Sequence, residues 1–376
     1  IDEVWYLHTV AGQKISFFPG TSMLCMAASC LDKNGVRWGD YLARFVHENI
    51  AQSGLWDGVF YDNTWQDITW FTDDRADVDR DGRPDQELDR EWRKGYEHLF
   101  AQTRGLAGSN FLIVGNMGPG HEQYRDAMDG ALLELFPQFS WSYGMHIYDV
   151  QSKGHQPRFV MINGGAATST IRDTRRMRFT LASTLLGDGY FSFDIGSRHG
   201  ETWWYEEYNR DIGHPRTGAQ RIGASSTEPF FAEDAVWKRE FDYGVVFANP
   251  TRATQTVALP DDLEWLTLSR IRSALPRTIV DRFQIGAEDG VIAFRLPTDI
   301  IEGVVQNKSF ARFFNLHGYR VRHGIVVDKN YFAPDEVVYA GDLYHDGHIE
   351  YVTVRGPRLR VVAQDGKILQ ETYPYG

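Results

Sequence analysis

The chain has 376 residues, 42% of them hydrophobic, and its length suggests two domains, or one large domain with an appendage. It lacks the apolar run of about eighteen residues that a membrane-spanning helix needs, which argues against a membrane partner. The formal net charge of −12 argues against nucleic acid as a partner, because phosphate binding needs clustered Lys and Arg.

Between residues 20 and 200, short apolar runs alternate with amphipathic stretches, a pattern typical of βα units on a parallel sheet. Apolar stripes predict helices over 41–50, from Leu88 to an end at Gly105, and from Ile171 to Leu186. The six expected strands are Met23–Ala27, Gly58–Asp62, Phe111–Asn116, Ala131–Phe136, Phe159–Asn163 and Gly189–Asp194.

Six strands are two short of a (β/α)8 TIM-type barrel, the fold class that this α/β pattern predicts. Residues 5–8 and 14–19 are separated by too few residues for a helix and predict a hairpin. The first barrel strands are therefore expected upstream of the chain, or they are absent.

The C-terminal part changes character near Trp237, where short alternating strands with turn residues predict an all-β domain. The expected domains are a (β/α) barrel over 1–235, a β-sandwich-like domain over 236–330 and a tail over 331–376. The tail contains a β-hairpin pattern similar to an FG-GAP-type repeat. Cys25 and Cys30 are too few for a disulfide scaffold, so a small disulfide loop and two buried thiols are equal alternatives.

Polar residues close several of the predicted strands, at the barrel edge where active sites lie. Asp62 and Glu134 are the candidate catalytic pair, because glycoside hydrolysis needs one carboxyl group as acid and one as nucleophile or base. Glu134 interrupts an apolar run that should be buried, which would not hold an unpaired carboxylate. The alternatives are a helix cap or turn role for Asp62 and an ion pair with Arg for Glu134.

Further polar and aromatic residues in the predicted loops are candidates for substrate binding. The amides suit hydrogen bonds to sugar hydroxyls, and the exposed rings suit stacking; the alternatives are loop geometry for the amides and core packing for the rings. The set is Asn63, Trp65, Asn116, Trp141, Asn163, Asp194 and Trp203.

The segment 77–85 matches the first nine positions of a calcium loop, with alternating Asp residues and a Gly at the tight turn. The expected ligands of a structural Ca²⁺ are Asp77, Asp79, Asp81 and Asp85, and a solvated acidic loop is the alternative. The loop is incomplete, because Leu88 occupies the position where an EF-hand has Glu. Bound calcium would favour an extracellular setting.

The chain also resembles a known family, the barrel-type glycoside hydrolases distantly similar to the endo-α-1,4-polygalactosaminidase group. The resemblance rests on 5–8, on 56–63 with its Asp-Gly-Val-x-x-Asp strand, on 115–116, on 133–135 and on Trp203-Trp-Tyr-Glu-Glu-Tyr208. It implies that Asp62 and Glu134 are the catalytic carboxylates.

The resulting hypothesis is a glycoside hydrolase that cleaves a poly- or oligosaccharide and is secreted or displayed at the cell surface. The sequence names neither the sugar nor the linkage, and it leaves the oligomeric state open. The rival hypothesis is a non-catalytic carbohydrate-binding or cell-surface protein that keeps the barrel.

Overall fold

The computed structural model describes residues 1–295 and several segments beyond them. Gaps lie at 33, 74, 119, 155, 167, 195–202, 210–211, 224–230, 243, 260–264, 268–277 and 281. The later described segments are 337–341, 344, 350–355, 358–363 and 367–372. The predicted domain boundary near 330 falls outside the described residues.

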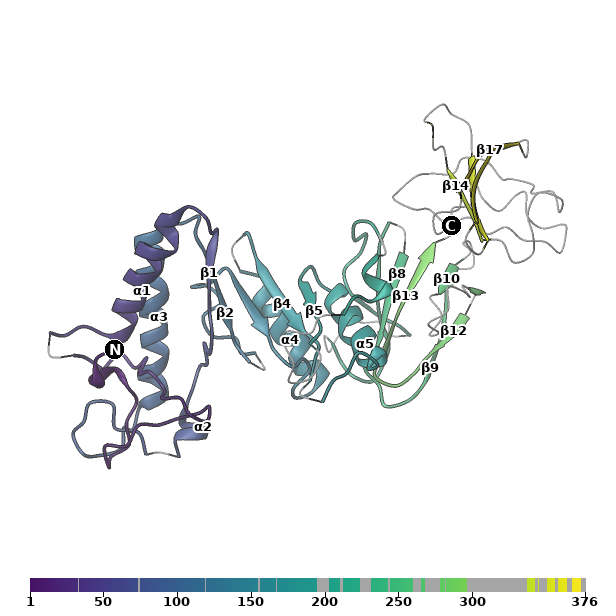
Figure 1. The fold of residues 1–376 in the computed structure, drawn as a ribbon. Coiled ribbons are helices and arrows are strands. Elements are labelled where there is room, and N and C mark those ends of the chain that lie inside the picture. The colour runs from purple at the N-terminus through teal and green to yellow at the C-terminus, as the bar shows by residue number, and fades with distance from the viewer. Residues whose placement is uncertain are drawn as a thin grey trace.

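The centre of the N-terminal part is a parallel sheet of five strands in sequential order (Figure 1). Its strands are β1 (Gly58–Tyr61), β2 (Leu112–Asn116), β3 (Gly130–Leu133), β4 (Phe159–Asn163) and β5 (Tyr190–Ser192). Each corresponds to a predicted strand, which confirms the α/β class. Within the described residues the sheet is not closed, so the complete barrel stays a prediction.

Within the described residues, five α-helices connect or flank these strands. They are α1 (Trp38–Asn49), α2 (Thr69–Thr72), α3 (Leu88–Ala107), α4 (Trp141–Ser152) and α5 (Thr174–Leu185). Helix α3 passes the expected end at Gly105 and ends at Ala107, and the residue that follows it, Gly108, has a φ of 93° that suits glycine. The sequence pattern did not predict α4, because apolar Tyr143 and Val150 lie on the side of the helix opposite its buried residues, so the apolar residues are not confined to one face.

The strand predicted over Met23–Ala27 is wrong, whereas the hairpin predicted before it is present as a short antiparallel pairing of residues 7–9 with 13–15. Leu24 forms only an isolated antiparallel bridge with Tyr6, and His8 forms another with Lys14. The segment is instead pressed against α3, where a Cβ atom on Gly95 would lie 1.5 Å from the Met26 carbonyl oxygen. Its apolar residues are therefore buried by a helix rather than by neighbouring strands. Cys25 and Cys30 are both buried free thiols here.

The two faces of the parallel sheet differ in burial. Residues that face the helices, such as Ile113, Leu133 and Ile162, are at most 1% exposed. On the other face, Phe60 is 48% and Tyr190 is 51% exposed. Side chains alternate between the two faces along a strand. A residue two positions after an open-face residue such as Phe60 therefore points to the same face. This spacing directs Asp62 toward that face at the carboxyl edge of the sheet.

An antiparallel part follows the parallel sheet and shares its core. Its strands include β6 (Gln220–Arg221), β7 (Trp237–Glu240), β8 (Gly244–Asn249), β10 (Trp265–Thr267), β11 (Thr278–Val280) and β13 (Asp289–Arg295), which form one sheet. Strands β9 (Gln255–Ala258) and β12 (Arg282–Ile285) form a second. Arg178 on α5 pairs with fully buried Asp289, which ties the two parts together.

Residues near the C-terminus form an antiparallel sheet of four strands. They are β14 (Val337–Gly341), β15 (Glu350–Arg355), β16 (Arg358–Ala363) and β17 (Ile368–Thr372), paired in sequential order. The antiparallel sheets agree with the predicted all-β character after Trp237. No helix among the described residues is long and apolar enough to cross a membrane.

Candidate active site

Three polar side chains meet at the carboxyl edge of the sheet. Asp62 follows β1, Asn116 ends β2, and Glu134 follows β3. The strands are neighbours in that order, so Asn116 lies on the middle strand between the two acids. The topology therefore brings together residues that are far apart in the sequence.

The amide of Asn116 holds both carboxylates at once. Its Nδ2 donates to Asp62 Oδ1 at 2.9 Å and to Glu134 Oε2 at 3.2 Å. Its Oδ1 accepts a hydrogen bond from the Gly118 backbone N–H at 2.9 Å, which fixes the orientation of the amide. Since both carboxylate oxygens are bound to the same nitrogen, they are at most about 6 Å apart.

Glu134 lies just after a strand, whereas its sequence suggested a place inside one. The strand ends at Leu133, and Leu135 has a φ of 58°, so Glu134 lies just past β3 and not inside it. It is half-buried, and its backbone N–H donates to the Gly118 carbonyl oxygen at 2.8 Å. The prediction from burial within a strand was wrong, although the residue does lie at the predicted edge.

The loop after Asp62 is fastened to the next strand and to α3. Thr64 donates through both its backbone N–H and its Oγ1 to the Asn116 carbonyl oxygen, at 2.8 and 2.7 Å. Asn63 has a φ of 55°, and its carbonyl oxygen accepts from Tyr96 Oη at 2.7 Å. No described helix begins at Asp62, so a turn role is the alternative that remains for it beside catalysis.

A buried histidine beneath this loop was not found from the sequence. His121 Nε2 lies 3.0 Å from the Thr64 carbonyl oxygen, and burial lowers the pKa of His121 to about 4. The ring is therefore neutral near pH 7 and acts as a hydrogen-bonding support for the loop. A His after a strand gives no sequence pattern that separates this role from a catalytic one.

An aromatic cluster lies beside the candidate site. Phe17, Trp65, Trp70 and Phe71 contact one another edge to face or tilted, with ring centroids 5.0 to 5.7 Å apart. A Cβ atom on Gly118 would lie 3.7 Å from Trp65 Nε1, so the half-buried Trp65 ring borders the loop that orients Asn116. Trp70 is 57% exposed and offers more open ring surface than Trp65.

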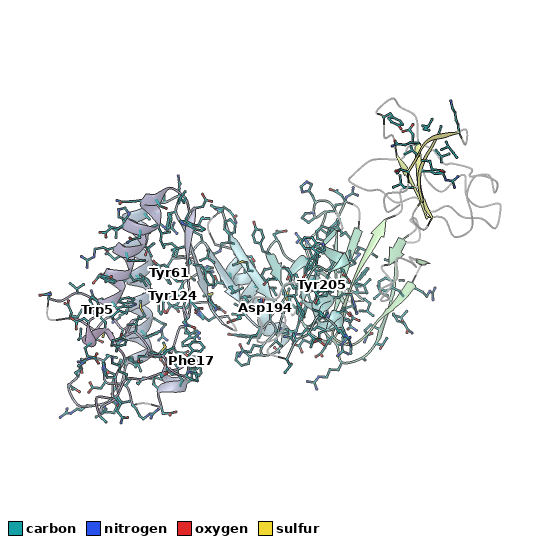
Figure 2. All side chains as sticks on the ribbon, viewed as in Figure 1. Trp5, Phe17, Tyr61, Tyr124, Asp194 and Tyr205 are labelled. Atoms are coloured by element: carbon teal, nitrogen blue, oxygen red, sulfur yellow. The ribbon has the colours of Figure 1, made fainter. Side chains whose placement is uncertain are left out.

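The remaining predicted substrate contacts have different environments. Asn163 is buried and donates to Ser192 Oγ at 3.0 Å, while its Oδ1 has no hydrogen-bond partner in the described structure. Asp194 lies beyond β5 near the middle of the molecule (Figure 2), and a Cβ atom on Gly165 would approach its backbone to 2.9 Å. Trp203 is 46% exposed. Contact of these residues with substrate stays a prediction.

Trp141 does not lie on an exposed loop as expected. It is the first residue of α4, it is 4% exposed, and its Nε1 donates to Ser183 Oγ at 2.8 Å. The preceding Ser140 caps the helix by accepting from the Tyr143 N–H. The indole is therefore part of the packing between α4 and α5.

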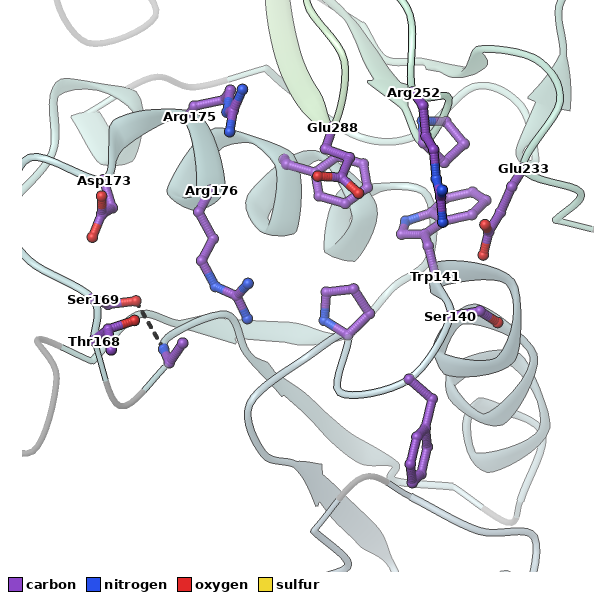
Figure 3. Close-up of a pocket in the computed structure, with 15 residues that line it drawn as sticks. Ser140, Trp141, Thr168, Ser169, Asp173, Arg175, Arg176, Glu233, Arg252 and Glu288 are labelled. Carbon is purple, nitrogen blue, oxygen red and sulfur yellow. Dashed lines mark hydrogen bonds between the residues drawn. The ribbon is translucent and has the colours of Figure 1, made fainter.

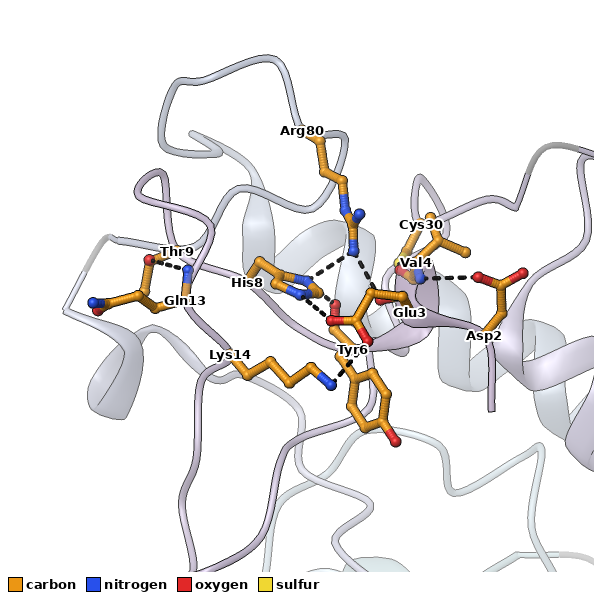
Figure 4. Close-up of polar contacts among 10 residues, drawn as sticks. All are labelled: Asp2, Glu3, Val4, Tyr6, His8, Thr9, Gln13, Lys14, Cys30 and Arg80. Carbon is orange, nitrogen blue, oxygen red and sulfur yellow. Dashed lines mark hydrogen bonds and ion pairs between the residues drawn. The ribbon is translucent and has the colours of Figure 1, made fainter.

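The predicted calcium loop brings three of its four acids together. Carboxylate oxygens of Asp77, Asp79 and Asp85 all lie within 4.8 Å of one another, whereas Asp81 is not part of this group. Burial, with the neighbouring aspartates as smaller causes, raises the pKa of Asp85 above its ordinary value of 3.8. Arg80 joins the loop to the N-terminal segment by donating to the Glu3 carbonyl oxygen and contacting His8 (Figure 4).

Calcium binding to this loop stays a prediction that thermal unfolding can test. We expect Ca²⁺ to raise the melting temperature relative to chelator, with about 3 kcal/mol of stabilisation once free Ca²⁺ exceeds its Kd a hundredfold. A raised folded-state pKa means that the ion-free loop loses stability as pH rises through the window above 3.8. The calcium effect should therefore be larger at pH 7 than at pH 4.

Differential scanning fluorimetry measures the calcium effect. Asp77→Asn and Asp85→Asn should remove it, and Asp73→Asn, at an exposed residue paired with Arg75, is the matched control. Asp81→Asn should also reduce the calcium effect if all four aspartates of the motif are ligands. It should leave the effect unchanged if only the three grouped in the structure are ligands. A melting temperature that Ca²⁺ does not change at either pH would refute the site.

Two carboxylates held at the carboxyl edge of a parallel α/β sheet are the arrangement that glycoside hydrolases use. A family model described as Hypothetical glycosyl hydrolase family 15 matches residues 2–245, a range that contains every predicted site residue. The chain belongs to this family, which confirms the predicted glycoside hydrolase resemblance. The closer likeness to the polygalactosaminidase group is not shown.

Two solved structures have partial similarity to this chain. An α-amylase from Anoxybacillus is 12% identical to this chain. The match covers 78% of this chain and 71% of the amylase chain, with a TM-score of 0.38. A β-L-arabinopyranosidase from Geobacillus stearothermophilus is 12% identical, with coverages of 76% and 67% and a TM-score of 0.40. TM-scores this low assign neither a fold nor an activity to this chain. No curated protein matches it.

Proposed function

We propose that this protein is a glycoside hydrolase that cleaves glycosidic bonds in a poly- or oligosaccharide. The observation that carries the proposal is the single amide of Asn116, which binds Asp62 and Glu134 together at the carboxyl edge of the sheet. Membership of a glycosyl hydrolase family supports the same activity. The two acids are close enough to act on one bond from opposite sides.

In this proposal Asp62 is the ionised partner, and Glu134 donates a proton to the departing sugar oxygen. Asp62 is exposed to solvent, whereas Glu134 is half-buried beside β3. Asn63, Trp65, Asn163, Asp194 and Trp203 are the proposed substrate contacts around the pair. We further propose secretion or display at the cell surface, a setting that provides Ca²⁺ for the loop at 77–85.

The experiment that tests the activity is a screen of the purified protein on a panel of polysaccharides. We expect new reducing ends from at least one of amylose, galactan, dextran, xylan and chitosan. The double variant Asp62→Asn with Glu134→Gln serves as the blank for contaminating hydrolases. If the wild type releases no more reducing ends than this blank on any member of a broad panel, the rival carbohydrate-binding function is favoured.

A further inference from the structure

The described part of the chain contains a pocket of about 620 Å³ that was not predicted from the sequence. Its walls come from the loops after β3 and β4, from the first turns of α4 and α5, and from turns of the antiparallel part (Figure 3). Pro137 and Phe139 represent the first loop, Thr168 the second, and Arg252 and Glu288 the antiparallel part.

The pocket has an apolar base and a polar rim. Trp141 and Phe179, which are 4% and 5% exposed, pack against each other with ring centroids 6.3 Å apart. At the rim, Phe139 is 66% exposed. The exposed Phe139 ring beside polar groups suits a sugar ring, because a sugar ring has an apolar face and hydroxyl groups around its edge.

The rim carries charges of both signs that are available to a ligand. Within the described part of the chain, the side chains of Arg175, Arg252 and Glu288 form no hydrogen bond or ion pair, and all three residues are exposed. By contrast, the Arg176 guanidinium donates hydrogen bonds to the Gly164 and Phe136 carbonyl oxygens. Guanidinium groups donate and carboxylates accept, so the rim can serve both roles of a sugar hydroxyl.

The balance of charge argues for a neutral ligand. Arg175, Arg176 and Arg252 face the carboxylates of Asp173, Glu233 and Glu288 around the same pocket. A phosphate or an acidic sugar would be attracted by the first group and repelled by the second. A neutral sugar meets neither penalty and can hydrogen-bond to both groups.

The pocket is also close to the catalytic candidates along the chain. Pro137 lies three residues after Glu134, so their Cα atoms are at most about 11 Å apart. Likewise, Ala166 in the pocket wall lies three residues after Asn163. These short separations place part of the pocket wall near the carboxyl edge of the sheet, which is the observation that links the pocket to the carboxylates.

We propose that this pocket is a distal subsite that binds a neutral sugar residue of the same glycan chain that the carboxylates cleave. The inference rests on the proposed function and deepens it, because such a subsite selects long chains over single terminal sugars. Arg252 and Glu288 would bind hydroxyl groups, and Phe139 would cover the ring at the rim.

The kinetic test compares chain lengths on the polysaccharide that the wild type cleaves. Arg252→Ala and Phe139→Ala should each lower kcat/KM by about tenfold or more on the long chain. Both should leave the shortest oligosaccharide that is cleaved unaffected. Arg44→Ala and Phe45→Ala, at exposed positions on α1, are the matched controls. An equal loss at every length, or no loss at any, would overturn the inference.

A binding test separates failure of the subsite from failure of the activity. Native gels that contain amylose, galactan, dextran, xylan or chitosan should retard the Glu134→Gln protein, and adding Arg252→Ala or Phe139→Ala should abolish the retardation. Retardation of this kind in a protein without hydrolase activity would retain the pocket as a sugar site and reject the proposed function. The subsite would be rejected if the protein hydrolyses a glycan and both pocket variants are retarded as strongly as the protein without them. It would also be rejected if no gel retards the protein.

Discussion

Glu134→Gln and Asp62→Asn are each expected to lower kcat/KM by about 10²- to 10⁴-fold on any glycan that the protein cleaves. Each substitution keeps the shape of the side chain and its place beside Asn116 but removes the carboxyl group. Without Glu134 the leaving oxygen departs unprotonated, and without Asp62 the anomeric carbon has no carboxylate to stabilise or attack it. The rate of reducing-end release by the purified variants measures the effect.

Matched controls keep this test specific. Asp57→Asn changes the same residue type at the opposite end of β1, and Glu48→Gln changes an exposed acid on α1. Both should retain wild-type turnover, and all four variants should melt near the wild-type temperature. Undiminished turnover in Glu134→Gln or in Asp62→Asn would show that the pair is not the catalytic machinery.

Retention of anomeric configuration is the second expected result. The carboxylate oxygens bound by Asn116 are at most about 6 Å apart, which fits the roughly 5–5.5 Å of retaining enzymes and is below the roughly 6.5–9.5 Å of inverting ones. That gap accommodates attack by Asp62 on the anomeric carbon while Glu134 protonates the leaving oxygen. Water activated by Glu134 then displaces Asp62. Proton NMR of the first product gives the anomer directly, and inversion would contradict the short separation.

Asn116 should act as a positioning residue for this chemistry. Asn116→Ala removes the donor shared by both acids, and we expect kcat to fall by about 10²- to 10³-fold. A role confined to holding substrate would instead raise KM and spare kcat. Asn116→Asp should lose more activity than Asn116→Ala, because it places a third carboxyl group between the pair and repels the ionised Asp62. Asn110→Ala, at the other end of β2, is the control, and an unchanged kcat in Asn116→Ala would contradict the role.

The sequence alone determined the strand ends at which these residues lie. Short apolar runs that end in polar residues predicted β1 to β5, since a buried parallel strand must be apolar and its polar neighbour marks the edge. The same local patterns predicted α3 and the acidic loop at 77–85. These features depend on neighbours in the chain, so periodicity and turn chemistry are sufficient to find them.

Only the tertiary structure decided how these residues meet. The sequence suggested Asn116 as a substrate contact, but the order of β1, β2 and β3 makes it the link between the two acids. Trp141 seemed exposed from its local sequence, yet packing of α4 on α5 buries it under a pocket. Register, strand order and helix packing arise from contacts between distant segments. For Asp62 and Glu134, the sequence placed each acid at the edge of the sheet, and the fold set the distance between them.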